Sequence, residues 1–201
     1  MRIIVFCAII FLAACTGIEG QSDFSIELKA DRDSINTHFA DPVKTQLIED
    51  DLASFTGLHF YEADEKFVIP ARFESISRAP IEEFATTTTR RAKYRAKGYL
   101  HFEYEGKEYQ LKVYENAMYA SRPDYDGSLF LPFTDVTNGK ESYGGGRYLD
   151  FNIRKMDNVV IDFNRSYNPY CAYNPKYSCP IPPEENDLDF AVTAGVKKWH
   201  D

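Results

Sequence analysis

The sequence predicts a mainly β domain of the α+β class, in which an N-terminal helical segment packs on an antiparallel sheet that forms a sandwich or a partly open barrel. Three observations predict it. Apolar residues follow helical spacing as far as Phe55, and from about residue 58 they alternate with polar residues, which is the period of a half-buried strand. Aromatic residues make up 15% of the chain, and such residues favour strands.

The first residues are typical of an export signal rather than of this domain. Residues 3–14 are apolar without interruption, a run too short to span a bilayer core, which needs about 20 such residues. The segment Leu12-Ala13-Ala14-Cys15 resembles the bacterial lipobox, in which the cysteine is lipidated. We therefore expect a lipoprotein signal peptide at 1–15, a small and polar tether at 16–23, and a single globular domain at 24–201.

This expectation implies a location in the bacterial cell envelope, at a membrane held through lipid on Cys15. Thr16 follows the cysteine instead of the Asp that retains many lipoproteins in the inner membrane, so the outer membrane is favoured. The formal net charge of the chain is −8. Because an acidic surface repels nucleic acids, we expect none among its partners.

Two helical segments are expected before residue 58. The first starts near residue 24 and ends at the Asp41-Pro42 step, because the residue before a proline avoids helical geometry. The second covers residues 45–55, and Gly57 provides its C-terminal stop. The apolar face of the first segment is formed by Phe24, Ile26, Leu28 and Ile35.

Alternating patterns then predict strands at 67–73, 100–104 and 109–113. The last two are separated by Glu105-Gly106-Lys107, which predicts a hairpin. A short strand is expected at 128–131, ended by Pro132, and a closing strand at 188–198.

One further hairpin is expected between residues 149–153 and 161–163, with a loop at 156–158 that brings the two apolar faces together. This register would align short polar side chains on the other face. Such a ladder could hold a divalent cation or could be a solvated sheet face. Its members would be Asp150, Asn152, Asp162 and Asn164.

Cys171 and Cys179 follow in an irregular segment with two Tyr-Asn-Pro triplets. Two cysteines close in sequence in an exported domain predict a disulfide, with free thiols or half of a metal site as alternatives. The four histidines are scattered and none lies at ligand spacing near the cysteines, so we expect no metal and no cofactor. A nucleophilic Cys171 would need a nearby base, and the segment contains no histidine.

Three runs, 131–150, 162–174 and 179–186, carry a family resemblance. They contain Tyr-Gly-Gly-Gly-Arg-Tyr-Leu, Asp-Phe-Asn-Arg-Ser-Tyr-Asn-Pro-Tyr-Cys-Ala and Cys-Pro-Ile-Pro-Pro-Glu-Glu-Asn. In this order they resemble the domain of unknown function 1684 family of uncharacterised bacterial and archaeal proteins. Val196 stands where that family has a Glu, which puts any role of that carboxylate in doubt here. The resemblance implies a shared fold and no activity.

Arg147 follows three glycines and offers a planar fork for a carboxylate or a phosphate. The alternative is a structural arginine paired with Asp162 or Glu185. An Asx-type turn is expected from Asp135 to Glu141. The candidate binding residues are Arg147, Asp162, Asn164, Tyr167, Asn168 and Tyr173.

These residues predict a lipid-anchored, extracytoplasmic domain for ligand binding or envelope interaction, with a small anion as a possible ligand. One alternative is an envelope hydrolase with Asp162 as base and Arg147 as electrostatic clamp. A second alternative is a purely structural module, in which the motifs fasten a long loop to the sheet.

Overall fold

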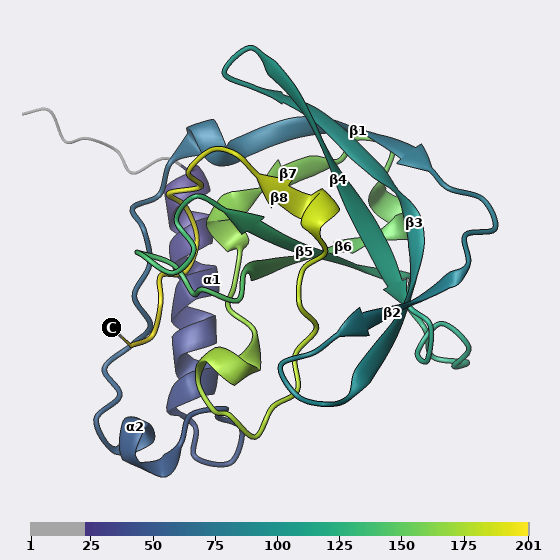
Figure 1. Cartoon of the computed structure of the whole chain (residues 1–201). Helices are drawn as coiled ribbons and strands as arrows, with labels where there is room; N and C mark the ends of the chain where they lie inside the picture. Colours follow the sequence, from purple (N-terminus) through teal and green to yellow (C-terminus); the bar gives the residue numbers. More distant parts are fainter. Residues whose placement is uncertain (1–22, 201) are drawn as a thin grey trace, which may run out of the picture.

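A computed structural model describes residues 23–200, in which eight strands form a curled, largely antiparallel sheet beside one long helix (Figure 1). The expected signal peptide, Cys15 and most of the tether lie outside the described residues. The helices are α1 (Asp23–Ala40) and α2 (Glu49–Ala53). The strands are β1 (Val68–Ser75), β2 (Ile81–Ala85), β3 (Arg91–Tyr104), β4 (Lys107–Asn116), β5 (Ser128–Asp135), β6 (Arg147–Asn152), β7 (Val160–Asp162) and β8 (Asp187–Leu188).

Five short 3-10 turns connect or end these elements within the described part of the chain. They are η1 (Glu65–Phe67), η2 (Ile153–Lys155), η3 (Phe163–Arg165), η4 (Tyr170–Ala172) and η5 (Glu184–Asn186). The strands follow the order β6-β5-β4-β3-β1-β7, β2 pairs with β3, and β8 runs parallel to β5. The predicted fold class, a mainly β domain with an N-terminal helix, is therefore confirmed.

The hairpin of β3 and β4 is the longest paired region, and it forms where the sequence predicts it. Glu105 and Gly106 both have positive φ, 51° and 78°, as a two-residue turn of type I′ requires. The register shifts between Ala96 and Gly98. Such a bulge increases the local twist and helps the sheet to curl.

The predicted hairpin between 149–153 and 161–163 is wrong, and so is its polar ladder. β6 pairs with β5, and β7 pairs with β1, so Asp150 lies opposite Phe130 and Asp162 lies opposite Val68. The prediction assumed that strands adjacent in sequence pair with each other. Here η2 turns the chain away after β6, and Met156 and Val159 are buried in the core instead of forming a hairpin loop.

Two smaller expectations are also corrected. Pro132 does not end a strand, because Tyr148, which lies opposite it, exchanges backbone hydrogen bonds with Tyr167 and needs no donor from the proline. The closing strand at 188–198 is reduced to the two residues of β8, followed by irregular chain that contacts the region near Phe60 through a bridge with Val196.

The main core fills the inside of the curled sheet, while a second, smaller core lies between α1 and the C-terminal segment. The second core contains Phe39, Leu47, Leu58, Tyr173 and Val196. Of the residues of α1, only Leu28 and Phe39 are buried. Most of the helix surface is therefore partly or fully exposed, and an open groove lies along one side of it.

Candidate functional site

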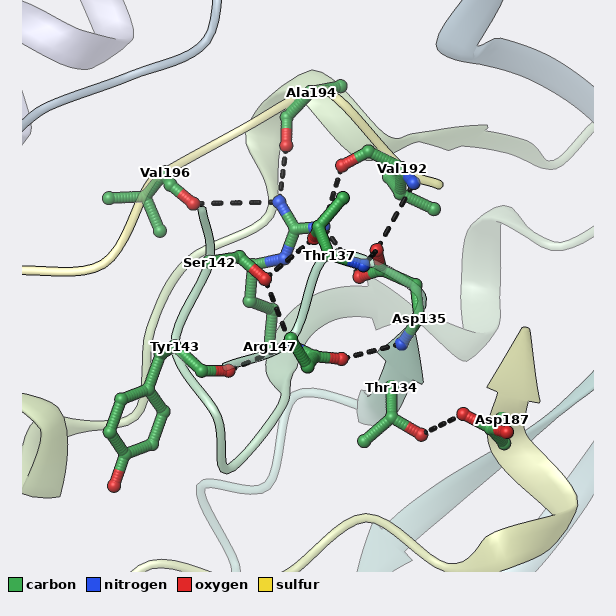
Figure 2. A network of polar contacts seen from close by, with 11 residues as sticks. Thr134, Asp135, Thr137, Ser142, Tyr143, Arg147, Asp187, Val192, Ala194 and Val196 are labelled. Carbon is green, nitrogen blue, oxygen red and sulfur yellow. Dashed lines mark hydrogen bonds and ion pairs between the residues drawn. The ribbon is translucent and has the colours of Figure 1, made fainter. Parts of the chain in front are cut away.

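Arg147, the first candidate for an anion site, lies in the core and not at a surface. Its side chain is 0% exposed. Figure 2 shows its guanidinium surrounded by protein acceptors: Nη2 donates to Asp135 Oδ2 at 2.7 Å and to Val192 O at 2.8 Å, and Nη1 donates to Ala194 O. Every one of these acceptors belongs to the protein, so a ligand has no access to this guanidinium.

The acid that pairs with Arg147 is Asp135, and not Asp162 or Glu185 as the sequence suggested. Both partners of this ion pair are fully buried. Asp135 Oδ1 also accepts from the backbone N–H of Thr137 at 2.9 Å, which forms the expected Asx-type turn, and from that of Val192. Glu185 instead accepts from Lys112 and Tyr114 on β4. The network thus fastens the C-terminal segment to β5 and β6.

Asp162 and Asn164 also form hydrogen bonds with neighbouring residues of the protein. Asp162 Oδ1 caps η3 through the N–H of Asn164, and its Oδ2 accepts from Arg165 Nε at 3.0 Å. Asn164 bonds to both the N–H and the carbonyl of Asp64, which holds the segment before β1 in place. Burial is the largest influence on Asp162 and raises its pKa.

An open groove of about 540 Å³ lies between α1 and the segment 164–173. We call it the α1 groove. In Figure 1 the green segment near residue 170 lies beside the purple helix. Four of the six candidate binding residues line the groove, whereas Arg147 and Asp162 do not. The four are Asn164, Tyr167, Asn168 and Tyr173.

The wall contributed by α1 combines an apolar stripe with polar groups, namely Asp31, Arg32, Ser34 and His38. Leu28, Arg32, Ile35 and Phe39 all line the groove, at the spacing of one helix face. The Arg32 guanidinium lies over the Phe60 ring, 4.7 Å from its centroid. Arg32 Nε and Nη2 are buried and have no hydrogen-bond partner. Burial lowers the pKa of Arg32 while Glu62 and Asp162 raise it, and the guanidinium stays charged.

The opposite wall offers oxygen acceptors. Asn168 is 1% exposed; its Nδ2 donates to Lys197 O at 2.9 Å, whereas its Oδ1 has no partner. Ser166 Oγ, also buried, has no partner either. Buried polar atoms are normally paired, so unpaired ones beside open space indicate a place for ligand or water.

Asp150 also lines the groove, and it accepts a hydrogen bond from the Tyr167 hydroxyl at 2.7 Å. Asp150 is an exposed residue, so its carboxylate can be reached from the groove and from solvent. Burial raises the pKa of Asp150, and the hydrogen bond from Tyr167 opposes this shift in part. Burial and the nearby Asp150 also raise the pKa of Tyr167, which therefore remains a donor.

Cys171 and Cys179 are free thiols in the structure, so the predicted disulfide is not found. The two residues are nevertheless neighbours, since the backbone N–H of Cys171 donates to Cys179 Sγ at 3.2 Å. Within residues 23–200, no group of three or more His, Cys, Asp or Glu side chains is arranged to hold a metal ion. No helix in this part of the chain is long and apolar enough to cross a membrane.

Sequence reasoning missed Arg32 and the rest of the α1 wall. The signal was present, because Arg32 lies four residues after Leu28, three before Ile35 and seven before Phe39. A cation at such a position falls on the apolar face of the helix. It was overlooked because the neighbouring Asp31 and Asp33 make the segment look solvated.

The fold is a curled, largely antiparallel sheet with an open groove between a helix and a tyrosine-rich segment. The chain belongs to the family described as a protein of unknown function, DUF1684, which matches residues 53–197. The family predicted from the sequence motifs is thereby confirmed, and α1 precedes the matched range.

One solved structure extends the likeness to most of the chain. It is the solution NMR structure of an uncharacterized protein of Haloarcula marismortui, which is 30% identical in sequence, with a TM-score of 0.68. The match covers 87% of this chain and 94% of that chain. No curated protein matches the chain.

Proposed function

We propose that the protein is a lipid-anchored, extracytoplasmic binding protein whose α1 groove holds a small amphipathic organic anion. The observation that carries this proposal is the half-buried Arg32, whose Nε and Nη2 have no hydrogen-bond partner, in a groove of ligand size. Small-molecule sites are concave, mostly apolar and about 300–1,000 Å³ in volume, with a few polar groups that orient the ligand.

The groove has matching parts for each portion of such a ligand. Arg32 would take a carboxylate or a phosphate, because a guanidinium binds planar oxyanions through two parallel hydrogen bonds. Leu28, Ile35 and Phe39 would cover the hydrocarbon part. Their α1 stretch is about 16 Å long at the rise of an α-helix, which suits an elongated molecule.

Asp150 and Asn168 supply acceptors that the anion alone would not satisfy. A hydroxyl or an ammonium group on the ligand would donate to them. The preferred ligand is therefore an anion that also carries a hydrogen-bond donor, as an amino acid does. Such ligands occur in the cell envelope, where the lipid on Cys15 would hold the protein.

The hydrolase alternative has no comparable support, because it needs Arg147 and Asp162 at one reacting centre. Arg147 is fully buried and committed to Asp135 and three carbonyl groups. Asp162 is bonded to Arg165 and Asn164. Neither Arg147 nor Asp162 lines the α1 groove. The motif around Arg147 fits the structural alternative instead.

Three probes with the same aromatic ring test the proposal: L-phenylalanine, 3-phenylpropionate and phenethylamine, at millimolar concentrations. In NMR spectra of the purified protein, L-phenylalanine and 3-phenylpropionate should change the chemical shifts of groove residues such as Tyr173 and Val196. Of the two anionic probes, L-phenylalanine should bind more tightly, because its ammonium group also donates to Asp150. Phenethylamine should bind weakest, since it offers Arg32 no anion.

Arg32→Gln should abolish the response to both anionic probes. Arg72→Gln is the matched control, because Arg72 is an exposed arginine on β1 that pairs with Glu74 outside the groove. It should leave binding unchanged. If neither anionic probe perturbs the groove, or if Arg32→Gln binds them as wild type does, the proposed ligand class is wrong.

A further inference from the structure

A second feature of the molecule, separate from the α1 groove, is the pair of thiols in the loop 170–180. Cys171 lies in η4 and is partly exposed, whereas Cys179 is buried, with 7% of its surface exposed. The N–H of Cys171 donates to Cys179 Sγ at 3.2 Å. The two sulfur atoms therefore belong to adjacent residues in space, although eight positions separate them in sequence.

The two cysteines differ in how firmly they are held. Cys179 lies against the β2–β3 loop, where it exchanges hydrogen bonds with Thr87: its N–H donates to Thr87 Oγ1 at 3.1 Å, and Thr87 N–H donates to its carbonyl at 2.9 Å. The next residue, Pro180, accepts from the Tyr148 hydroxyl. Cys171 lies on a single 3-10 turn without a side-chain cap. One thiol is thus fixed and covered, and the other lies on a short turn that solvent reaches.

The surroundings of Cys171 favour its thiolate. The Tyr143 hydroxyl lies 3.7 Å from Cys171 Sγ and can donate to it. The hydrogen bond from the Cys179 thiol, followed by that from Tyr143, lowers the pKa of Cys171 to about 6. The same contact with Cys171, together with burial, raises the pKa of Cys179. A partly exposed thiolate beside a covered thiol is the arrangement that thiol–disulfide exchange uses.

We propose that Cys171 and Cys179 form a redox-active dithiol site that exchanges with disulfides, with Cys171 as the attacking sulfur and Cys179 as the resolving sulfur. The Cys171 thiolate attacks one sulfur of a disulfide RSSR, the S–S bond breaks, and one RS⁻ leaves with a proton from solvent. Cys179 then loses its proton and attacks Cys171 Sγ, which expels the second RS⁻. The protein dithiol is oxidised by two electrons, and RSSR is reduced to two RSH.

The test uses the full chain in mixtures of oxidised and reduced glutathione, followed by acid quench, alkylation and trypsin. Cleavage after Lys176 places Cys171 in peptide 166–176 and Cys179 in peptide 177–197, so only a disulfide keeps them joined. Cys7 and Cys15 fall in a different peptide, which ends at Lys29. The two peptides should be joined in oxidised mixtures and separate in reduced ones while the circular dichroism stays native.

Two outcomes of this titration would overturn the proposal. In one, the native protein never forms the linked peptides at any glutathione ratio. In the other, the link forms but resists dithiothreitol until the protein is unfolded, which would make it a structural bridge and not an exchanging site.

Single variants assign the two roles. Cys179→Ser should trap a stable mixed disulfide between glutathione and Cys171, whereas Cys171→Ser should leave the covered Cys179 unmodified. A mixed disulfide on Cys179 alone would contradict the assignment. If either variant fails to fold, the wild type still decides the matter: alkylation of Cys171 by iodoacetamide should outpace that of Cys179 and reach half its maximal rate near pH 6. A half-maximal rate at the pH of an ordinary thiol, about 8.5, would contradict it.

Tyr143→Phe tests whether the Tyr143 hydroxyl stabilises the Cys171 thiolate, which a purely structural tyrosine would not do. Without the hydroxyl, the pH of half-maximal alkylation of Cys171 should rise, because one donor to the thiolate is lost. An unchanged pH profile would show that Tyr143 does not act on Cys171.

Discussion

The surroundings of Arg147 and Arg32 differ. Arg147 is sealed in the core, and its two terminal nitrogens donate to a carboxylate and to carbonyls of the C-terminal segment. Arg32 lines an open groove with Nε and Nη2 unpaired. Nε is unpaired in both arginines, so the difference lies in the terminal nitrogens, which the protein pairs in Arg147, and in the groove beside Arg32.

The difference between the two arginines has consequences for stability. A buried charge is tolerated when the protein supplies its partners, and such a charge holds chain segments together. A charge that is desolvated without partners lowers stability, and it is retained where a ligand supplies what the protein does not. We therefore expect substitutions at the two sites to differ in sign and in size.

The largest effect is expected for Asp135→Ala, which leaves the guanidinium of Arg147 buried without its carboxylate. Breaking a buried ion pair costs about 3–5 kcal/mol. For a domain of this size, that cost lowers the thermal midpoint by roughly 6–20 °C. Differential scanning calorimetry measures it directly.

The double variant Arg147→Met with Asp135→Leu is the control for that experiment. It removes both charges and should recover part of the lost stability, although the carbonyls of Val192 and Ala194 lose a donor. A double variant that is no more stable than Asp135→Ala would contradict the view that the unpaired charge is the main cost.

A second, smaller loss is expected for Gly195→Ala, next to the groove wall. Gly195 has φ +77°, and an added Cβ would lie 2.1 Å from Ser166 Oγ and 2.7 Å from the carbonyl oxygens of Phe163 and Ser166. Overpacking of this kind costs about 1–3 kcal/mol in addition to the strain of the backbone. Chemical denaturation should show a clear loss.

Gly106→Ala is the matched control, because Gly106 has nearly the same φ, +78°, but nothing within 4 Å of an added Cβ. It should lose only the conformational term of about 1–2 kcal/mol. Equal losses at the two positions would mean that the contact of Gly195 with Ser166 is unimportant.

The smallest effect is expected for Asp150→Asn, and it should depend on pH. Because burial raises the pKa of Asp150 above its ordinary 3.8, its contribution to stability is present below that value and is lost as the pH rises through the folded-state pKa. An uncharged Asn avoids this loss. The midpoint of the variant should thus exceed that of wild type by about 1–2 °C at neutral pH, and the difference should vanish in acid.

Asp41→Asn should give the opposite trend. A hydrogen bond from the backbone N–H of Val43, followed by one from the side chain of Lys44, lowers the pKa of Asp41. Its contribution to stability is therefore present above the ordinary pKa and is lost in acid. Thermal melts of both variants between about pH 2 and pH 7 compare the two signs, because the contribution of Asp41 is lost below its ordinary pKa of 3.8. A common direction for Asp41 and Asp150 would show that burial does not control the titration of Asp150.

Local patterns predicted the helical start, the fold class and the β3–β4 hairpin, because these depend on neighbours in sequence. Glu105-Gly106 at the turn and the flanking alternation were sufficient for that hairpin. The pairing of β7 with β1 could not be predicted in this way. It joins residues about ninety positions apart, and η2 shows no pattern that distinguishes it from a hairpin loop.

The site was predicted in part for the same reason. Asn164, Tyr167, Asn168 and Tyr173 belong to one continuous segment, so they line one groove together. Arg147 was misplaced because the sequence shows the glycines that precede it but not the C-terminal carbonyls that surround it. The neighbouring thiols of Cys171 and Cys179 were expected to be joined, and the structure has them side by side and free.

The most direct test of this account is the thermal midpoint of Arg147→Ala compared with that of Arg32→Ala under identical conditions. Arg147→Ala should lower the midpoint by roughly 6–20 °C, because it leaves Asp135 buried and unpaired. Arg32→Ala should leave it within about 2 °C of wild type, or raise it. A large loss at Arg32, or none at Arg147, would contradict the division between a structural and a ligand-binding arginine.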